Sequence, residues 1–264
     1  MNGWSLLLGA GALAAAGEYG IASYFFRRTM LRQNAATKRT MDMAGTNWDL
    51  YIPEIGKMKQ WMLEQEREDV YIRSGDGLKL HGTYFPGQGS GKLVICFHGY
   101  TSKGMSDYIG LSNYYLPRGY QMLLVDERAH GDSEGTYIGF GCLDREDALL
   151  WITYAVKRFG CGCQIWLHGT SMGASTVLMA SGLKLPPQVR GIVSDCAFTT
   201  CPCTEGPIPS AGLSDPETVR QHVQKEGRIR AEAVQCVRGS KESEGSHTLY
   251  PWGCGYFCSV QNVL

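Results

Sequence analysis

Short apolar runs alternate with amphipathic stretches through the middle of this chain. Three stretches repeat apolar residues at helical spacing, at about 108–116, 143–158 and 172–183. Six runs have the apolar or alternating character of strands: 69–72, 78–85, 93–97, 121–125, 164–167 and 191–193. Because strands that alternate with helices in sequence usually pair in parallel, the pattern predicts an α/β fold. It consists of a mostly parallel, doubly wound sheet with helices on both faces.

The N-terminal region contains the longest apolar stretch. Between residues 4 and 26 the only charged side chain is Glu18, and Arg27 and Arg28 follow directly. This length and basic flank predict a single-pass membrane anchor over residues 1–35, with the main domain on the cytoplasmic side. A buried or interfacial helix is the alternative, because Glu18 and the Ala and Gly residues weaken a span. Residues 36–66 are then expected to form a linker and an amphipathic helix.

The charge balance and the cysteine spacing argue against two classes of function, nucleic-acid binding and zinc binding. The 25 basic residues balance the 25 acidic ones, which argues against a nucleic-acid partner bound through bulk charge. Cysteines gather after residue 200, where zinc could be considered, but the paired two-residue spacing of zinc motifs is missing. Neither a metal nor another cofactor is expected. The cysteines in question are Cys201, Cys203, Cys236, Cys254 and Cys258.

Four polar motifs follow directly after predicted strands. They are HGYTS at 98–102, DERAHGDSEG at 126–135, HGTSMG at 168–173 and SDCAF at 194–198. Sites in α/β sheets form at the carboxyl ends of strands, so these motifs are expected to meet at one edge. The third motif fits G-x-S-x-G, in which a serine, here Ser171, lies on a sharp turn between a strand and a helix.

Together, in this order, the four motifs resemble the α/β-hydrolase superfamily, in particular its bacterial serine aminopeptidase and lysophospholipase-like branch. The resemblance covers about residues 70–199. It implies an α/β-hydrolase fold and hydrolysis of a small ester or amide through an acyl-serine. It also implies that Ser171 is the nucleophile and that the N–H groups of Met172 and Tyr100 form the oxyanion hole.

The resemblance fails for the other two members of the catalytic triad. The family order is Ser, Asp, His, yet neither the family's His-Gly-x-x-Asp pattern nor its histidine loop follows Phe198. Asp195 is a weaker candidate acid, because it ends a strand near the expected site. The histidines are expected to orient loops or to be incidental rather than to act as the base: His98, His130, His168, His222 and His247.

The last segment differs in character from the rest. The predicted α/β-hydrolase core is 67–200, and residues 201–264 lack buried-strand runs, so the sheet is expected to stop after its sixth strand. Read one nucleotide later, the codons for residues 249–264 permit FIHGDADTFVPFKMY, which contains the missing aspartate motif. We therefore hypothesise a frameshifted, non-native tail and an impaired, poorly stable hydrolase. The alternatives are a membrane-anchored non-catalytic pseudoenzyme or binding module, and an active hydrolase using Asp195 with an unrecognised histidine.

Overall fold

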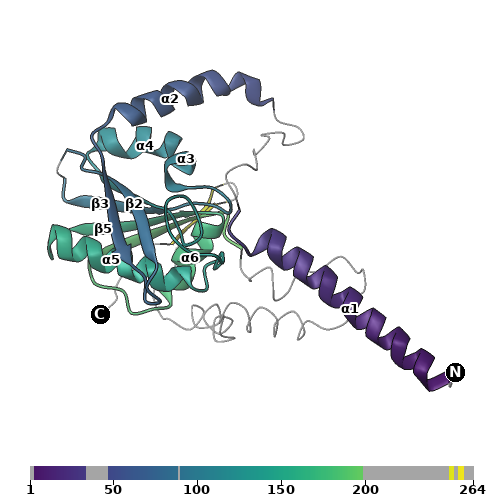
Figure 1. The fold of residues 1–264 in the computed structure, drawn as a ribbon. Coiled ribbons are helices and arrows are strands. Elements are labelled where there is room, and N and C mark those ends of the chain that lie inside the picture. Colours follow the sequence, from purple (N-terminus) through teal and green to yellow (C-terminus); the bar gives the residue numbers. More distant parts are fainter. Residues whose placement is uncertain (1–2, 34–46, 89, 199–249, 253–254, 259–264) are drawn as a thin grey trace.

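A single twisted sheet organises the chain in the computed structural model, which describes residues 3–33, 47–88, 90–198, 250–252 and 255–258 (Figure 1). The strand order is β1-β2-β4-β3-β5-β6-β8-β7. Strands β3, β4, β5 and β6 pair in parallel, whereas β1 and β2 pair antiparallel with each other and β2 with β4. The strands are β1 (Glu68–Arg73), β2 (Lys79–Phe85), β3 (Lys92–Phe97), β4 (Gln121–Val125), β5 (Gln164–Thr170), β6 (Val189–Asp195), β7 (Tyr250–Trp252) and β8 (Gly255–Cys258).

The predicted α/β-hydrolase fold and its six strands are confirmed. The parallel part of the sheet ends at β6, as expected, and the short strands β8 and β7 lie antiparallel beyond it. The predictions that fall on residues 199–249, among them Cys201, Cys203 and Cys236, concern residues outside the described part of the chain.

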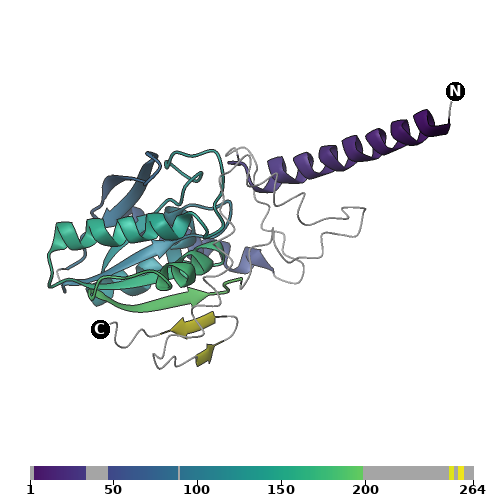
Figure 2. The ribbon, with the colours of Figure 1, turned by 90° about the horizontal axis from the view of Figure 1, so that it is seen from below.

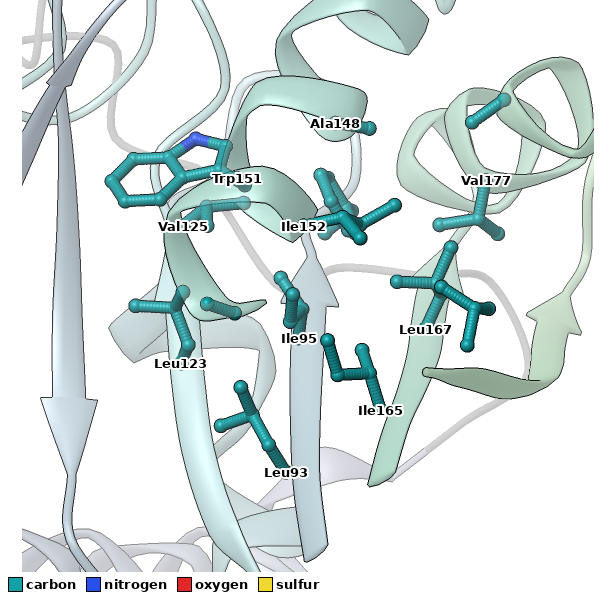
Figure 3. Packing of buried hydrophobic residues seen from close by; sticks show 14 of the residues in the cluster. Leu93, Ile95, Leu123, Val125, Ala148, Trp151, Ile152, Ile165, Leu167 and Val177 are labelled. Carbon is teal, nitrogen blue, oxygen red and sulfur yellow. The ribbon is translucent and has the colours of Figure 1, made fainter. Parts of the chain in front are cut away.

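Alternating residues of the central strands build two separate cores. In β3, Leu93 and Ile95 face one core, and Val94 and Cys96 face the other, because successive side chains of a strand point to opposite faces. The first core is covered by α5 (Asp144–Phe159) and α6 (Met172–Ser181), and Figure 3 shows Trp151 and Ile152 of α5 packed on it. Burial on both faces explains the nearly continuous apolar sequence of these strands.

The second core lies under α2 (Ile52–Glu64), α3 (Gly104–Asp107) and α4 (Ile109–Tyr115), on the opposite face of the sheet (Figure 1). Met62 of α2 is buried there, which agrees with the predicted amphipathic helix. The helix expected at about 108–116 is confirmed as α4, and the short helix α3 precedes it. The described residues also form two short 3-10 helices, η1 (Trp48–Leu50) and η2 (Leu116–Arg118).

The N-terminal apolar segment forms α1 (Gly3–Thr29), which extends away from the sheet (Figures 1 and 2). The predicted helix is therefore confirmed, but the predicted membrane span is not supported. Over the ranges that the structure describes, no helix combines the length and apolar character needed to cross a bilayer. Glu18 and the many Ala and Gly residues of α1 dilute its larger apolar side chains.

Strand order sets the position of the site. The chain passes from β3 to β4 on one side, then returns to β5 on the other side of β3. Ligands of open α/β sheets bind beyond the carboxyl ends of the strands at such a reversal. The HGYTS motif follows β3, and the HGTSMG motif spans the end of β5 and the start of α6, so both lie at this point.

Candidate active site

Ser171 lies in a strained turn between β5 and α6. Its φ of 54° and ψ of −109° fall in a region that side chains rarely adopt, and its side chain is exposed. The Ser171 N–H donates a hydrogen bond to the carbonyl oxygen of Asp195 at 2.8 Å. This bond ties the turn to the end of β6 and holds the serine in its strained conformation.

Two glycines allow the turn to close. A Cβ built on Gly169 would overlap the carbonyl group of Gly173, and one built on Gly173 would overlap the carbonyl of Phe97. In addition, the Gly173 N–H donates to the carbonyl oxygen of His98 at 3.0 Å. Strand β5 and helix α6 therefore approach each other closely at these two positions.

The loop after β3 lies against the nucleophile. A Cβ built on Gly99 would be 3.4 Å from the Cβ of Ser171. The Gly99 N–H donates to Asp107 at 2.7 Å, and the Thr101 N–H donates to the Nε2 atom of His130 at 3.2 Å. These bonds hold the main chain at Gly99 and at the Tyr100–Thr101 peptide group, so they position the loop beside Ser171.

Met172 occupies the other side of the nucleophile as the first residue of α6. Its side chain is fully buried, and its N–H belongs to the first helical turn, where N–H groups have no partner within the helix. The positive end of the helix dipole lies at the same place. The structure thus brings Ser171, Met172 and the Tyr100 loop together.

His98 and His130 are held as neutral rings. Each donates from Nδ1 to a carbonyl oxygen, His98 to Gly99 at 2.7 Å and His130 to Arg128 at 2.9 Å. Each accepts a main-chain N–H at Nε2, His98 from Glu127 at 3.0 Å and His130 from Thr101. Burial and the neighbouring His98 lower the pKa of His130 to about 3. Neither ring has a nitrogen lone pair left to remove a proton from serine.

His168 and Asp195 lie on neighbouring strands. Burial lowers the pKa of His168 to about 4, and its Nδ1 atom is 3.0 Å from the hydroxyl of Tyr115. Asp195 is half-buried and pairs in register with Thr170, which places it one residue from Ser171 in the sheet. His222 and His247 lie outside the described residues.

Sequence reasoning missed the polar framework behind these loops. Asp126 accepts hydrogen bonds from the ring of His81 at 2.8 Å and from the N–H groups of Gly104 and Asp132 at 3.1 and 3.0 Å. His81, Asp126 and Asp132 also have suitable atoms close enough together to hold a metal ion. Both oxygens of Asp126, however, already accept these bonds, so the group is satisfied as a structural network.

A second part of the framework consists of buried charges. Arg128 forms a two-pronged ion pair with Asp147, at 2.7 and 2.8 Å. Glu127 and Asp144 are also fully buried, and neither oxygen of Glu127 has a hydrogen-bond partner among the described residues. The dense run of ionisable residues in DERAHGDSEG directly after a strand was the sequence signal for this framework.

Comparison with known proteins now defines the class. A family model described as alpha/beta hydrolase fold matches residues 92–233, which is more than half of the chain. The chain therefore belongs to the α/β-hydrolase family. The branch within this family is not identified by the match.

Individual relatives share part of the chain. It is 24% identical over 135 residues to an uncharacterized protein, YqkD, of Bacillus subtilis, covering 51% of this chain and 44% of that protein. It is 29% identical over 147 residues to an uncharacterized protein, YfhR, of Salmonella typhimurium, covering 50% of each. The chain thus spans about half the length of these curated relatives.

Among solved structures, the esterase Pf2001 of Pyrococcus furiosus is 31% identical. The match covers 52% of this chain and 53% of that chain with a TM-score of 0.47.

Proposed function

We propose that this protein is a serine hydrolase that cleaves ester or amide bonds of small molecules through an acyl-serine intermediate. The observation that carries this proposal is the strained, exposed Ser171 at the N-terminus of α6, with the Tyr100 loop against it. A structure keeps such strain where surrounding bonds enforce it and chemistry uses it. Membership of a family of hydrolases supports the same reaction.

In the proposed reaction the Oγ atom of Ser171 attacks the substrate carbonyl carbon, and the bond to the leaving alcohol or amine then breaks. Negative charge develops on the carbonyl oxygen. The N–H groups of Met172 and Tyr100 would stabilise that charge, assisted by the dipole of α6. Water then attacks the acyl-serine, which releases the acid and regenerates the hydroxyl.

Proton transfer requires a base, and His98 and His130 are excluded by their hydrogen bonds. His168 is a weak base with a pKa of about 4. These observations favour a second candidate, a binding module that keeps the elbow without turnover. For the first candidate, we propose that the missing Asp is encoded out of frame after residue 198 and that the family's histidine is absent from this chain. The nucleotide sequence decides this point, because the shifted frame must spell HGDAD.

A fluorophosphonate probe, which phosphonylates activated serines, tests the proposed function. We expect the full chain to be labelled slowly because the base is missing, Ser171→Ala to lose the label, and Ser181→Ala, at the other end of α6, to keep it. A folded protein that is never labelled contradicts the hydrolase proposal and supports the binding module. Labelling that survives in Ser171→Ala would show that another residue reacts.

A further inference from the structure

The segment that follows α1 is docked on the active-site loops. We call residues 26–32 the N-terminal strap. The Ile138 N–H donates to the carbonyl oxygen of Met30 at 2.7 Å, and the Arg32 N–H donates to the carbonyl oxygen of Thr136 at 2.8 Å. Figure 2 shows how α1 reaches the domain only at this end. Two main-chain bonds therefore place the strap along the loop between β4 and α5.

The strap is also tied to the oxyanion loop. The hydroxyl of Tyr100 donates to the carbonyl oxygen of Thr29 at 2.9 Å, and the ring of Tyr100 stacks on Phe140 with centroids 5.3 Å apart. The guanidinium group of Arg32 donates to the carbonyl oxygens of Ser133 and Gly131. The strap thus contacts both loops that flank Ser171.

The strap also joins a cluster of apolar and aromatic side chains. The strap contributes Met30 to a buried cluster that also contains Met172, the residue after the nucleophile. Met30 and Phe140 are only 6% and 9% exposed, so the surrounding side chains cover both of them almost completely. The full cluster is Met30, Ala129, Ile138, Phe140 and Met172, with Phe26, Tyr100 and Phe198 packed against it.

We infer that Met30 of the N-terminal strap is a specificity-determining residue that limits the length of an apolar acyl group bound beside Ser171. This inference rests on the proposed function. A polar or charged acyl group would lose its hydrogen bonds to water against these side chains, whereas an apolar chain gains by burial. Because Met30 fills the cluster, the wild-type site accepts short chains, and shortening this side chain admits longer ones.

Chain-length selectivity tests the inference. Labelling rates are measured with ethyl and octyl fluorophosphonates for the full chain, Met30→Ala, Met30→Leu and the matched control Met62→Ala. Met62 is also buried, at 1% exposure, but lies in the core under α2. We expect the octyl-to-ethyl ratio to rise about tenfold in Met30→Ala, since each buried methylene contributes about fourfold. It stays unchanged in Met62→Ala and Met30→Leu.

Equal ratios in Met30→Ala and Met62→Ala would overturn the inference and leave Ser171 as the nucleophile. Absence of labelling with both reagents would instead contradict the proposed function. In that case binding of a dansyl amide with an octyl chain is compared between Ser171→Ala and Ser171→Ala/Met30→Ala. Tighter binding by the double variant supports the role of Met30, and equal binding or no binding overturns it. Thermal unfolding confirms that each variant is folded.

Discussion

Glu127 makes stability depend on pH in a direction opposite to that of most carboxylates. It is fully buried, and burial followed by repulsion from Asp144 raises its pKa well above the ordinary value. Burial also raises the pKa of Asp144 from 3.8 to about 6. Arg128 is already paired with Asp147 through two hydrogen bonds. One arginine therefore faces three buried carboxyl groups, which favours the protonated form of Glu127 and Asp144.

The sign of the effect follows from proton binding. Between about pH 4 and 6 the folded protein holds a proton on Asp144 that the unfolded chain has released. Asp144 therefore makes its full contribution to the free energy of unfolding below about pH 4. That contribution, about 3 kcal/mol, is lost as the pH rises through about 6. Because the pKa of Glu127 is raised further, the loss of stability continues at higher pH. One titrating group lowers the free energy of unfolding by no more than about 1.4 kcal/mol per pH unit.

The perturbation is Glu127→Gln, which removes the ionisable group and keeps the shape. The free energy of unfolding is measured by urea titration from pH 4.5 to 8. We expect the wild-type value to fall with rising pH and the fall to be smaller in Glu127→Gln, so that the variant is the more stable protein at pH 8. Glu66→Gln, an exposed control, should follow the wild type. Parallel pH profiles for Glu127→Gln and the wild type would refute this reasoning.

Three further substitutions test the turn at Ser171, the Tyr100 loop and the apolar core. Gly173→Ala places a Cβ on a carbonyl group and should cost about 3 kcal/mol or more by thermal or urea unfolding, whereas Gly110→Ala has open space and should not destabilise. Asp107→Ala frees the oxyanion loop and should slow fluorophosphonate labelling of Ser171 about tenfold while the melting temperature falls little; an unchanged rate would contradict the positioning role. Trp151→Ala empties a site that is 1% exposed and should cost about 3–5 kcal/mol in urea unfolding; a loss below about 1 kcal/mol would refute its place in the core.

The sequence predicted those features that depend on local pattern. Apolar runs located β3, β4 and β5, because a strand buried on both faces tolerates few polar residues. The elbow was also predictable, since only glycine fits at residues 169 and 173. Hydropathy predicted a helix at the N-terminus, but it could not predict that the C-terminal end of α1 contacts the rest of the protein, as Thr29 does through Tyr100.

Contacts between distant residues could not be predicted in this way. Asp126, after β4, accepts a hydrogen bond from His81 in β2, and the Tyr100 hydroxyl donates one to Thr29, which is 71 residues earlier in the sequence. Such contacts depend on loop conformations, including the positive φ of 55° at Thr101 and 60° at Ala129. No periodicity or propensity specifies those angles, so the polar framework and the N-terminal strap became visible only in three dimensions.

The site separates into two halves that depend on different parts of the chain. Ser171 and its neighbouring N–H groups are fixed by β3, β5 and α6, all of which precede residue 198. In contrast, neither His98 nor His130 can act as the base, because their ring nitrogens already form hydrogen bonds. Under the proposed function, loss of a base encoded in the later segment would prevent proton transfer but would leave Ser171 and its neighbouring N–H groups in place.

Chemical rescue distinguishes this situation from a complete triad. If the base is missing, imidazole in solution should speed the labelling of Ser171 by at least about fivefold, because a general base contributes about 100- to 10,000-fold when it is positioned. The increase should grow with the concentration of neutral imidazole and disappear in Ser171→Ala. If a histidine of the chain already serves the serine, added imidazole has almost nothing to supply, and a flat response would show that the base lies within the chain.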